Sequence, residues 1–307
     1  MTAICIEHLR KIYRSGWPGV PPVTALQGLS LSVDQGEIYG FLGPNGAGKT
    51  TTLKILLGLL RATDGKAEVL GEAAGSLSMR RRIGFLPEAP YFYDYLTAKE
   101  FLMFYGRLGG LGHADLEKRI PELLDIVGLT PAQSRQLRTF SKGMLQRVGL
   151  AQAIIHDPEL VILDEPMSGL DPVGRKQVRD VILSLRDRGK TVFFSSHIIP
   201  DVEMICDRVG IVMKGKLVAE GRVDELVGYG QTTSVEVVFE GINAEELPMT
   251  KTATRVIQRG RQCMLVLPGH DQLEDVLCFV RTHGGKLISI TPQKQSLEAL
   301  FLKQGMN

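Results

Sequence analysis

The segment GPNGAGKTT, residues 43–51, indicates the fold class of this 307-residue chain. It follows an apolar run, Ile38 to Leu42, that is typical of a buried strand. It precedes leucines that recur with the spacing of one helix face, at Leu53, Leu56, Leu57 and Leu60. A GxxxxGK[ST] pattern between a strand and a helix predicts a phosphate-binding loop. The alternative is a glycine-rich turn with a helix cap, but such a turn would not need a buried strand before it and a helix after it.

Each residue type in the loop suits a chain of phosphates. The glycines free the backbone to wrap phosphates with N–H groups, and Lys49 is expected to reach the β and γ phosphates. The Thr50 hydroxyl is a candidate ligand for Mg²⁺. The residues expected to contact the nucleotide are Gly43, Pro44, Asn45, Gly46, Ala47, Gly48, Lys49, Thr50 and Thr51.

Two carboxylates follow another apolar run, in LVILDEP at residues 160–166. We expect Asp164 to face the metal ion, because P-loop hydrolases place an aspartate on a strand next to the loop. Glu165 comes one residue later and is expected to polarise a water molecule in line with the γ-phosphate. A helix cap near a proline explains either acid alone, but it does not explain both after a buried strand.

His197 lies just beyond a further strand, in FFSSHIIP at residues 193–200. A histidine after a strand is often structural. Here Lys49 and Asp164 are expected at the same sheet edge, which favours a functional role. We therefore predict that the imidazole binds the γ-phosphate and positions the attacking water, with Lys49 and Glu165 as the other catalytic groups.

The segment FSKGMLQR, residues 140–147, predicts the start of a helix suited to an anion. Ser141 is a good N-cap, and Gly143 lets a ligand approach the backbone. An apolar stripe is expected behind them, formed by Met144, Leu145, Val148, Ala151 and Ile155. The chain therefore contains a second candidate half-site for phosphate.

These motifs resemble the nucleotide-binding subunit of an ABC transporter over about residues 3–220, with LDEP at 163–166 and SGLD at 168–171. FSKGM at 140–144 is similar to the LSGGQ segment of that family, with Lys142 and Met144 as departures. The resemblance implies ATP and Mg²⁺ as cofactors, ATP hydrolysis, and a second copy of the cassette or a paired cassette as partner. In that arrangement Ser141 and Gly143 bind the γ-phosphate held by the opposite subunit.

The resemblance extends to three further residues. Tyr13 stands where the family places an aromatic ring against adenine, and Asp171 in SGLD is implied to communicate across the dimer, although an acid before Pro172 is also a common turn device. Glu88 in GFLPEAP replaces the usual glutamine. An ionised carboxylate can approach Mg²⁺ or the attacking water, but it cannot donate a hydrogen bond.

The segment GFLPEAPYFYDYLTAKE, residues 84–100, is similar to ATPase subunits of the ABC-2 type, which pair with a separate integral membrane permease and usually export. This implies a peripheral location at the cytoplasmic face of the cell membrane. The aromatic cluster Tyr91, Phe92, Tyr93 and Tyr95 then lines a groove for a permease helix, or it forms a local core. The rival function is a soluble ABC ATPase acting on ribosomes or DNA; a P-loop kinase has no reason to contain FSKGM and SGLD.

The fold class expected is α/β, a P-loop ABC cassette with a mostly parallel sheet and an antiparallel β segment near the N-terminus. Further strands are expected at Leu160 to Leu163, Thr191 to Phe194 and Val209 to Met213, with helical spacing at Val178, Val181, Ile182 and Leu185. A helical subdomain at about 88–156 is inserted, so that the ATPase domain covers 1–228.

Residues 229–307 are expected to form a small α+β domain. Its strands are predicted in SVEVVFE, TRVIQR, CMLVL and KLISI, and its helices near 271–282 and 296–304. In some members of the resembled family such a domain regulates the ATPase or supports dimerisation. A stabilising addition is the alternative.

The composition bears on which partners and metal sites to expect. A net charge of +2, from 36 basic and 34 acidic residues, gives no indication of a nucleic-acid surface. Four widely spaced cysteines indicate neither a disulfide framework nor a zinc site. The first residues lack the apolar core of a secretory signal, and no later run approaches the ~18 apolar residues of a membrane span.

Overall fold

The structure is a computed structural model that describes residues 1–14, 19, 21–227, 232–243, 253–268, 272–294, 297–298 and 301. The chain divides into two compact units, Met1–Val223 and Asp224–Asn307. Each unit has a hydrophobic core of its own.

A six-stranded sheet forms the centre of the first unit, in the order β10-β9-β3-β8-β7-β6. Its strands are β3 (Ile38–Leu42), β6 (Ile83–Leu86), β7 (Leu160–Asp164), β8 (Thr191–Ser196), β9 (Arg208–Met213) and β10 (Lys216–Arg222). Five strands pair in parallel, and β10 pairs with β9 antiparallel. The inner strands are buried on both faces, which explains their continuous apolar sequences. The predicted mostly parallel sheet is confirmed.

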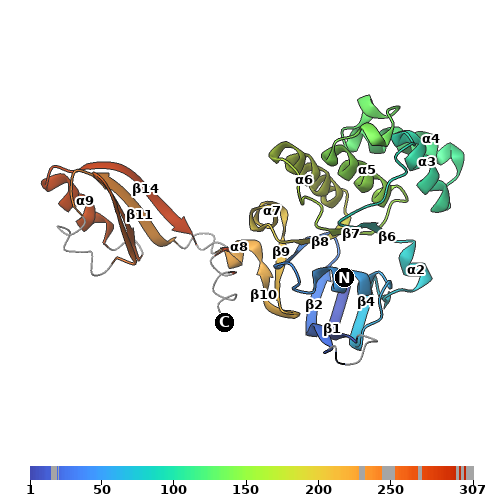
Figure 1. Cartoon of the computed structure of the whole chain (residues 1–307), viewed down its shortest axis with the longest axis horizontal. Helices are drawn as coiled ribbons and strands as arrows, with labels where there is room; N and C mark the ends of the chain where they lie inside the picture. Colours follow the sequence, from blue (N-terminus) through green and yellow to red (C-terminus); the bar gives the residue numbers. More distant parts are fainter. Residues whose placement is uncertain are drawn as a thin grey trace. The chain divides into compact units, whose positions relative to one another are not determined.

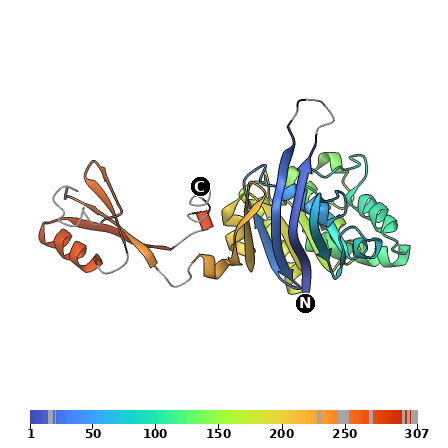
Figure 2. The same cartoon turned by 90° about the horizontal axis from the view of Figure 1, so that it is seen from below.

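A second, antiparallel sheet has the order β2-β1-β4-β5. Its strands are β1 (Thr2–Tyr13), β2 (Val23–Asp34), β4 (Asp64–Val69) and β5 (Glu72–Ala73), of which β1 and β2 are the long pair in Figure 2. Helix α1 (Lys49–Leu56) packs against β2, β4 and β7, so it lies between the two sheets. This places the segment after the glycine-rich loop in the core.

Helix α1 is shorter than the leucine spacing predicts. It ends at Leu56, because Gly58 adopts φ +68° and passes so close to Gly75 that a Cβ would overlap it. Leu57 and Leu60 lie beyond the helix and still pack against the core. The apolar spacing was therefore informative about burial but wrong about the helix end.

Helices α6 (Pro172–Asp187) and α7 (Ile199–Ile205) pack against the six-stranded sheet through contacts with β8 and, for α7, β3. The apolar face predicted for α6 is buried, at Val178, Val181, Ile182 and Leu185. The short helix α2 (Leu77–Arg80) precedes β6.

The segment between β6 and β7 is helical (Figure 1). It contains α3 (Ala98–Leu108), α4 (His113–Ile126), the 3₁₀ helices η1 (Thr130–Ala132) and η2 (Leu137–Thr139), and α5 (Lys142–Ile154). Helix α5 contacts α3, α4, α6 and β6. Because these neighbours surround the middle of the helix, every residue from Gln146 to Ala151 is buried, whereas Met144 and Leu145 of the predicted stripe are only partly buried.

The second unit contains a four-stranded antiparallel sheet in the order β12-β13-β11-β14. Its elements are β11 (Thr232–Glu240), β12 (Arg255–Arg259), β13 (Gln262–Leu267), α9 (Leu273–Thr282) and β14 (Lys286–Lys294), and α8 (Val223–Leu226) spans the division between the units. Val235, Val237 and Phe239 share a core with Val276 and Val280 of α9. Most of the helix predicted at 296–304, and the predicted domain boundary at 228, lie outside the described residues.

Candidate active site

The glycine-rich loop connects β3 to the N-terminus of α1. Gly48 has φ +104°, and a Cβ at this position would lie 2.7 Å from the Ala25 carbonyl oxygen. A Cβ at Gly43 would lie 2.5 Å from the Val212 carbonyl oxygen. No side chain caps α1, so its first N–H groups are available to an anion.

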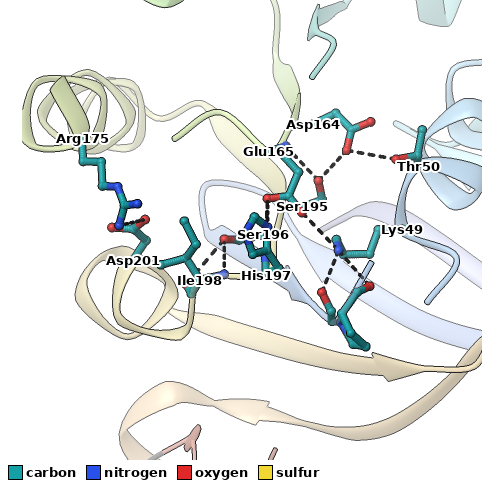
Figure 3. Close-up of polar contacts among 12 residues, drawn as sticks. Lys49, Thr50, Asp164, Glu165, Arg175, Ser195, Ser196, His197, Ile198 and Asp201 are labelled. Carbon is teal, nitrogen blue, oxygen red and sulfur yellow. Dashed lines mark hydrogen bonds and ion pairs between the residues drawn. The ribbon is translucent and has the colours of Figure 1, made fainter. Parts of the chain in front are cut away.

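Lys49 is buried, with a side chain only 6% exposed. Its Nζ donates to the carbonyl oxygens of Gly43 at 2.7 Å and Pro44 at 3.2 Å, and it lies 3.1 Å from Glu165 Oε1 (Figure 3). The two carbonyl contacts are hydrogen bonds, whereas the contact with Glu165 Oε1 is an ion pair. A phosphate oxygen that binds Lys49 would compete with Glu165 for this ammonium group.

Asp164 and Glu165 lie at the carboxyl end of β7, with side chains 3% and 6% exposed. Glu165 has φ +50°, an unusual conformation for a residue with a Cβ. Asp164 lies on the side of Thr50, whose Oγ1 is 3.4 Å from Asp164 Oδ1, and Glu165 contacts Lys49 and His197 (Figure 3). The two acids therefore have different surroundings despite being adjacent in sequence.

Ser195 holds this pair in place. Its buried hydroxyl donates to Asp164 Oδ1 at 2.6 Å and accepts the Glu165 N–H at 3.0 Å. No motif in the sequence singles out this residue. Its position, opposite Asp164 in the parallel pairing of β7 and β8, is the signal that points to it.

His197 contacts the second oxygen of the same glutamate. Its Nδ1 lies 2.8 Å from Glu165 Oε2, and its backbone N–H donates to that oxygen at 3.3 Å. A carboxylate can only accept, so Nδ1 carries the proton of this hydrogen bond. The ring is 40% exposed and can be reached from solvent.

A pocket of about 410 Å³ brings many of the predicted residues together. The predicted residues that line it are Tyr13, Asn45, Gly46, Gly48, Lys49, Thr50, Thr51, Glu88 and Glu165. Tyr13 is 41% exposed, and its hydroxyl lies 3.4 Å from Thr51 Oγ1. Ala47 is buried and its N–H donates to the Pro44 carbonyl oxygen, so its side chain is part of the scaffold.

Ser141, Gly143 and Asp171 are not among the residues that line this pocket. Ser141 caps α5, and its hydroxyl accepts the Met144 N–H at 3.3 Å. Asp171 caps α6 by accepting the Gly174 N–H at 3.1 Å. Gly143 lies beside Gly174, whose N–H donates to Asp171, so these residues belong to two neighbouring helix N-termini and not to the pocket around Lys49.

Arg147 is a further residue that the sequence analysis missed. It is buried in α5 and donates from Nη1 to the carbonyl oxygens of Val127 and Gly128, at 2.6 and 3.1 Å. Burial lowers the pKa of this guanidinium. The contacts fix the end of α4 to the helix that begins at Ser141.

The aromatic cluster is partly packed in the core and partly exposed. Phe92 packs on Phe101 at a centroid distance of 5.4 Å, whereas Tyr91 and Tyr95 are 80% and 62% exposed. Tyr93 connects them, because its ring contacts both tyrosines. One side of the cluster is therefore core and the other is surface.

Parallel strands that end at a phosphate-binding loop, with an acid at the end of a neighbouring strand, are typical of P-loop nucleotide-binding proteins. The ABC transporter family profile matches residues 26–168. An uncharacterized ABC transporter ATP-binding protein of Nostoc sp. is 47% identical over 306 residues, covering 99% of this chain and 90% of that protein. The linearmycin resistance ATP-binding protein LnrL of Bacillus subtilis is 35% identical and covers 96% of each chain.

A solved structure described as the ATP binding subunit of an ABC transporter has a TM-score of 0.63 and 31% identity, covering 73% of this chain and 91% of that one. The chain belongs to the family of ABC transporter ATP-binding proteins, and it is an ATPase. Within the described residues, no helix has both the length and the apolar character needed to cross a membrane.

Proposed function

We propose that this chain is the ATP-hydrolysing subunit of an exporter and that two copies close around two ATP molecules. The observation that carries the proposal is the separation of two phosphate-binding elements. The pocket around Lys49 does not include Ser141 or Gly143, although these residues begin a helix suited to an anion. A second copy, arranged head to tail, would bring each helix end to the other copy's nucleotide.

The surface at the start of α5 supports this arrangement. Ser141 and Lys142 are exposed, and the Lys142 side chain lies over Gly169 of the SGLD segment. The Ser141 hydroxyl accepts a hydrogen bond within its own helix, which leaves its proton free to donate. An ammonium, a hydroxyl and free N–H groups would together favour a terminal phosphate.

The residues beside the loop fit Mg²⁺. Thr50 Oγ1 and Asp164 Oδ1 are hard oxygen donors that lie 3.4 Å apart, and Glu88 lines the same pocket. Magnesium is usually bound through one or two protein oxygens together with substrate phosphates. When bound, the ion would neutralise phosphate charge; Thr50 and Asp164 would hold it, and Glu88 would approach it.

Hydrolysis requires little covalent chemistry from the protein. Lys49 would stabilise charge on the β and γ phosphates, and Glu165 would accept a proton from the attacking water. His197 would hold Glu165 in position through Nδ1 and approach the γ-phosphate from its exposed edge. Tyr13 would pack against the adenine ring.

Export through a separate membrane permease is the form of transport that we favour. The relative named for linearmycin resistance supports this direction. The exposed apolar side chains Tyr91, Tyr95, Phe104 and Leu108 would receive a cytoplasmic helix of the permease, which would hold the chain at the cytoplasmic face of the membrane. The substrate would be selected by the permease.

The decisive experiment is ATP turnover by Glu165→Gln, together with purification of the tagged chain from membranes. We expect the variant to bind ATP and to lose almost all hydrolysis, and a multi-span protein to copurify with the wild type. Turnover near the wild-type rate would remove Glu165 as the base. Enrichment of ribosomes or DNA in place of a membrane protein would contradict the transport function.

A further inference from the structure

A buried carboxylate outside the nucleotide pocket is hydrogen-bonded to one arginine and faces a second. Asp201, in the first turn of α7, is only 2% exposed. Arg179 donates from Nη1 to Asp201 Oδ1 at 3.0 Å. Arg175 Nη1 faces Asp201 Oδ2 at 4.0 Å, which is too far for a hydrogen bond (Figure 3). Both arginines belong to α6, so this cluster joins α6 to α7.

Arg175 also binds the segment that precedes α6. Its Nε donates to the Leu170 carbonyl oxygen, within SGLD, at 3.2 Å. Gly143 packs against this same segment: a Cβ on Gly143 would lie 3.9 Å from Gly174 Cα and 4.0 Å from Leu170 Cδ2. The helix end proposed to meet the other copy's nucleotide therefore abuts the turn that Arg175 holds.

Helix α7 depends on such contacts for its position. It has seven residues, and no side chain caps its N-terminus. A helix of this length is marginal without tertiary packing. Only Ile198 separates His197 from α7, and the Ile198 N–H is bonded to Ser196 Oγ at 2.9 Å. A shift of α7 would therefore move the histidine that contacts Glu165.

We infer that Asp201, acting with Arg175 and Arg179, is a positioning residue that links the SGLD turn to His197. Arrival of the other copy's nucleotide at Ser141 and Gly143 would displace Leu170 behind them and thereby move Arg175, and Asp201 would carry that movement through α7 to His197. The inference rests on the proposed function, because it presumes that a second copy meets this surface. A buried ion cluster is a costly way to stabilise a fold, which is consistent with a role in positioning.

The test compares Asp201→Asn and Arg175→Gln with Asp180→Asn in the full chain. Asp180 is the matched control, because it is also an acid that pairs with a basic residue of α6. Its side chain is 58% exposed and lies 3.5 Å from Lys176 Nζ. We expect both test variants to lower kcat for ATP hydrolysis about 2- to 30-fold, the range of coupling networks. ATP binding should stay within twofold of wild type, and Asp180→Asn should behave as wild type.

A double-mutant comparison separates positioning from general stability. If Asp201 acts through His197, adding Asp201→Asn to His197→Ala should lower the single-turnover rate no further. The inference is overturned if the rate losses of the two single variants multiply in the double variant. It is also overturned if kcat is unchanged in both Asp201→Asn and Arg175→Gln. If Asp201→Asn does not fold, Arg175→Gln decides alone, since Arg175 is 34% exposed. Glu165→Gln is included in the same assay, because its near-normal turnover would refute the proposed function instead.

Discussion

Glu165 Oε1 lies 3.1 Å from Lys49 Nζ, in a pair of side chains that are each 6% exposed. The proposed base is thus ion-paired with the lysine proposed to hold the phosphates. Glu165 Oε2 contacts His197, so each oxygen of this carboxylate has a partner. Phosphate binding to Lys49 would free Glu165 Oε1 to meet a water molecule, which links substrate binding to activation of the base.

Replacing Lys49 with methionine should weaken ATP binding and leave the chain folded. Loss of a hydrogen bond to a charged group costs about 1.5–3 kcal/mol, which corresponds to roughly 10- to 150-fold in affinity. Calorimetric titration with ATP measures this change. Lys54→Met is the control, because Lys54 is exposed on the same helix. Equal loss in both variants would count against a specific role for Lys49.

Replacing Ser195 with alanine should affect both stability and rate. The change leaves the buried Glu165 N–H without its partner and removes a donor to Asp164, at an expected cost of about 1–3 kcal/mol in free energy of unfolding. Because Asp164 is a proposed metal ligand, turnover should fall about 10- to 100-fold. Denaturant unfolding and steady-state kinetics check the two effects. Ser184→Ala serves for comparison, since the Ser184 hydroxyl donates only to Val181 O of its own helix.

Replacing Glu88 with glutamine restores the residue that the family usually has at this position. If the carboxylate approaches Mg²⁺, the magnesium concentration that gives half-maximal turnover should rise several-fold at saturating ATP, because an amide is a weaker ligand for a hard cation. Titration of the rate with Mg²⁺ tests this expectation. Glu122→Gln is the control, because Glu122 is exposed on α4. If Glu88→Gln needs no more magnesium for half-maximal turnover than this control does, Glu88 is not part of the metal site.

Stability should fall as pH is lowered from 7 towards 5, in part because of His156. Burial lowers the pKa of His156, and its Nε2 lies 3.0 Å from the Ile83 carbonyl oxygen. The unfolded chain therefore binds a proton on this histidine at a higher pH than the folded chain does. The contribution of His156 to the free energy of unfolding is present above its pKa in the unfolded chain, about 6.5. It is lost as the pH falls through the lower pKa of His156 in the folded chain. His156→Gln should flatten the dependence in denaturant unfolding at several pH values; an identical slope would contradict this.

The sequence was sufficient for the parallel sheet and for most of the nucleotide pocket, because contiguous motifs encode them. Lys49 and Thr50 follow a strand and begin a helix, and Asp164 and Glu165 end another strand, so their edge of the sheet is known without coordinates. The end of α1 was less predictable, since it depends on the approach of Gly58 to Gly75, which is a tertiary contact.

Residues that act through long-range pairing were missed for the same reason. Ser195 becomes meaningful only when β7 and β8 are in register, and Asp201 only when α6 lies beside α7. Arg147 was hidden because its carbonyl partners, at residues 127 and 128, are about twenty positions away in the chain. Periodicity and motifs carry local information, and these contacts are not local.

The proposal that two copies enclose each nucleotide can be tested at Gly143. A Cβ there would lie 3.9 Å from its nearest neighbour, an ordinary contact, so Gly143→Ala should fold normally. Ser141→Ala is less informative, because losing the cap alone costs about 0.5–2 kcal/mol. An added methyl group would obstruct only a ligand that approaches from outside the chain.

Sedimentation equilibrium of Glu165→Gln with saturating ATP and Mg²⁺ tests this proposal most directly. We predict a particle of two chains, each of 33.7 kDa, and reversion to one chain when Gly143→Ala is added although ATP is still bound. A Glu165→Gln protein that binds ATP yet sediments as a single chain at high concentration would contradict the account.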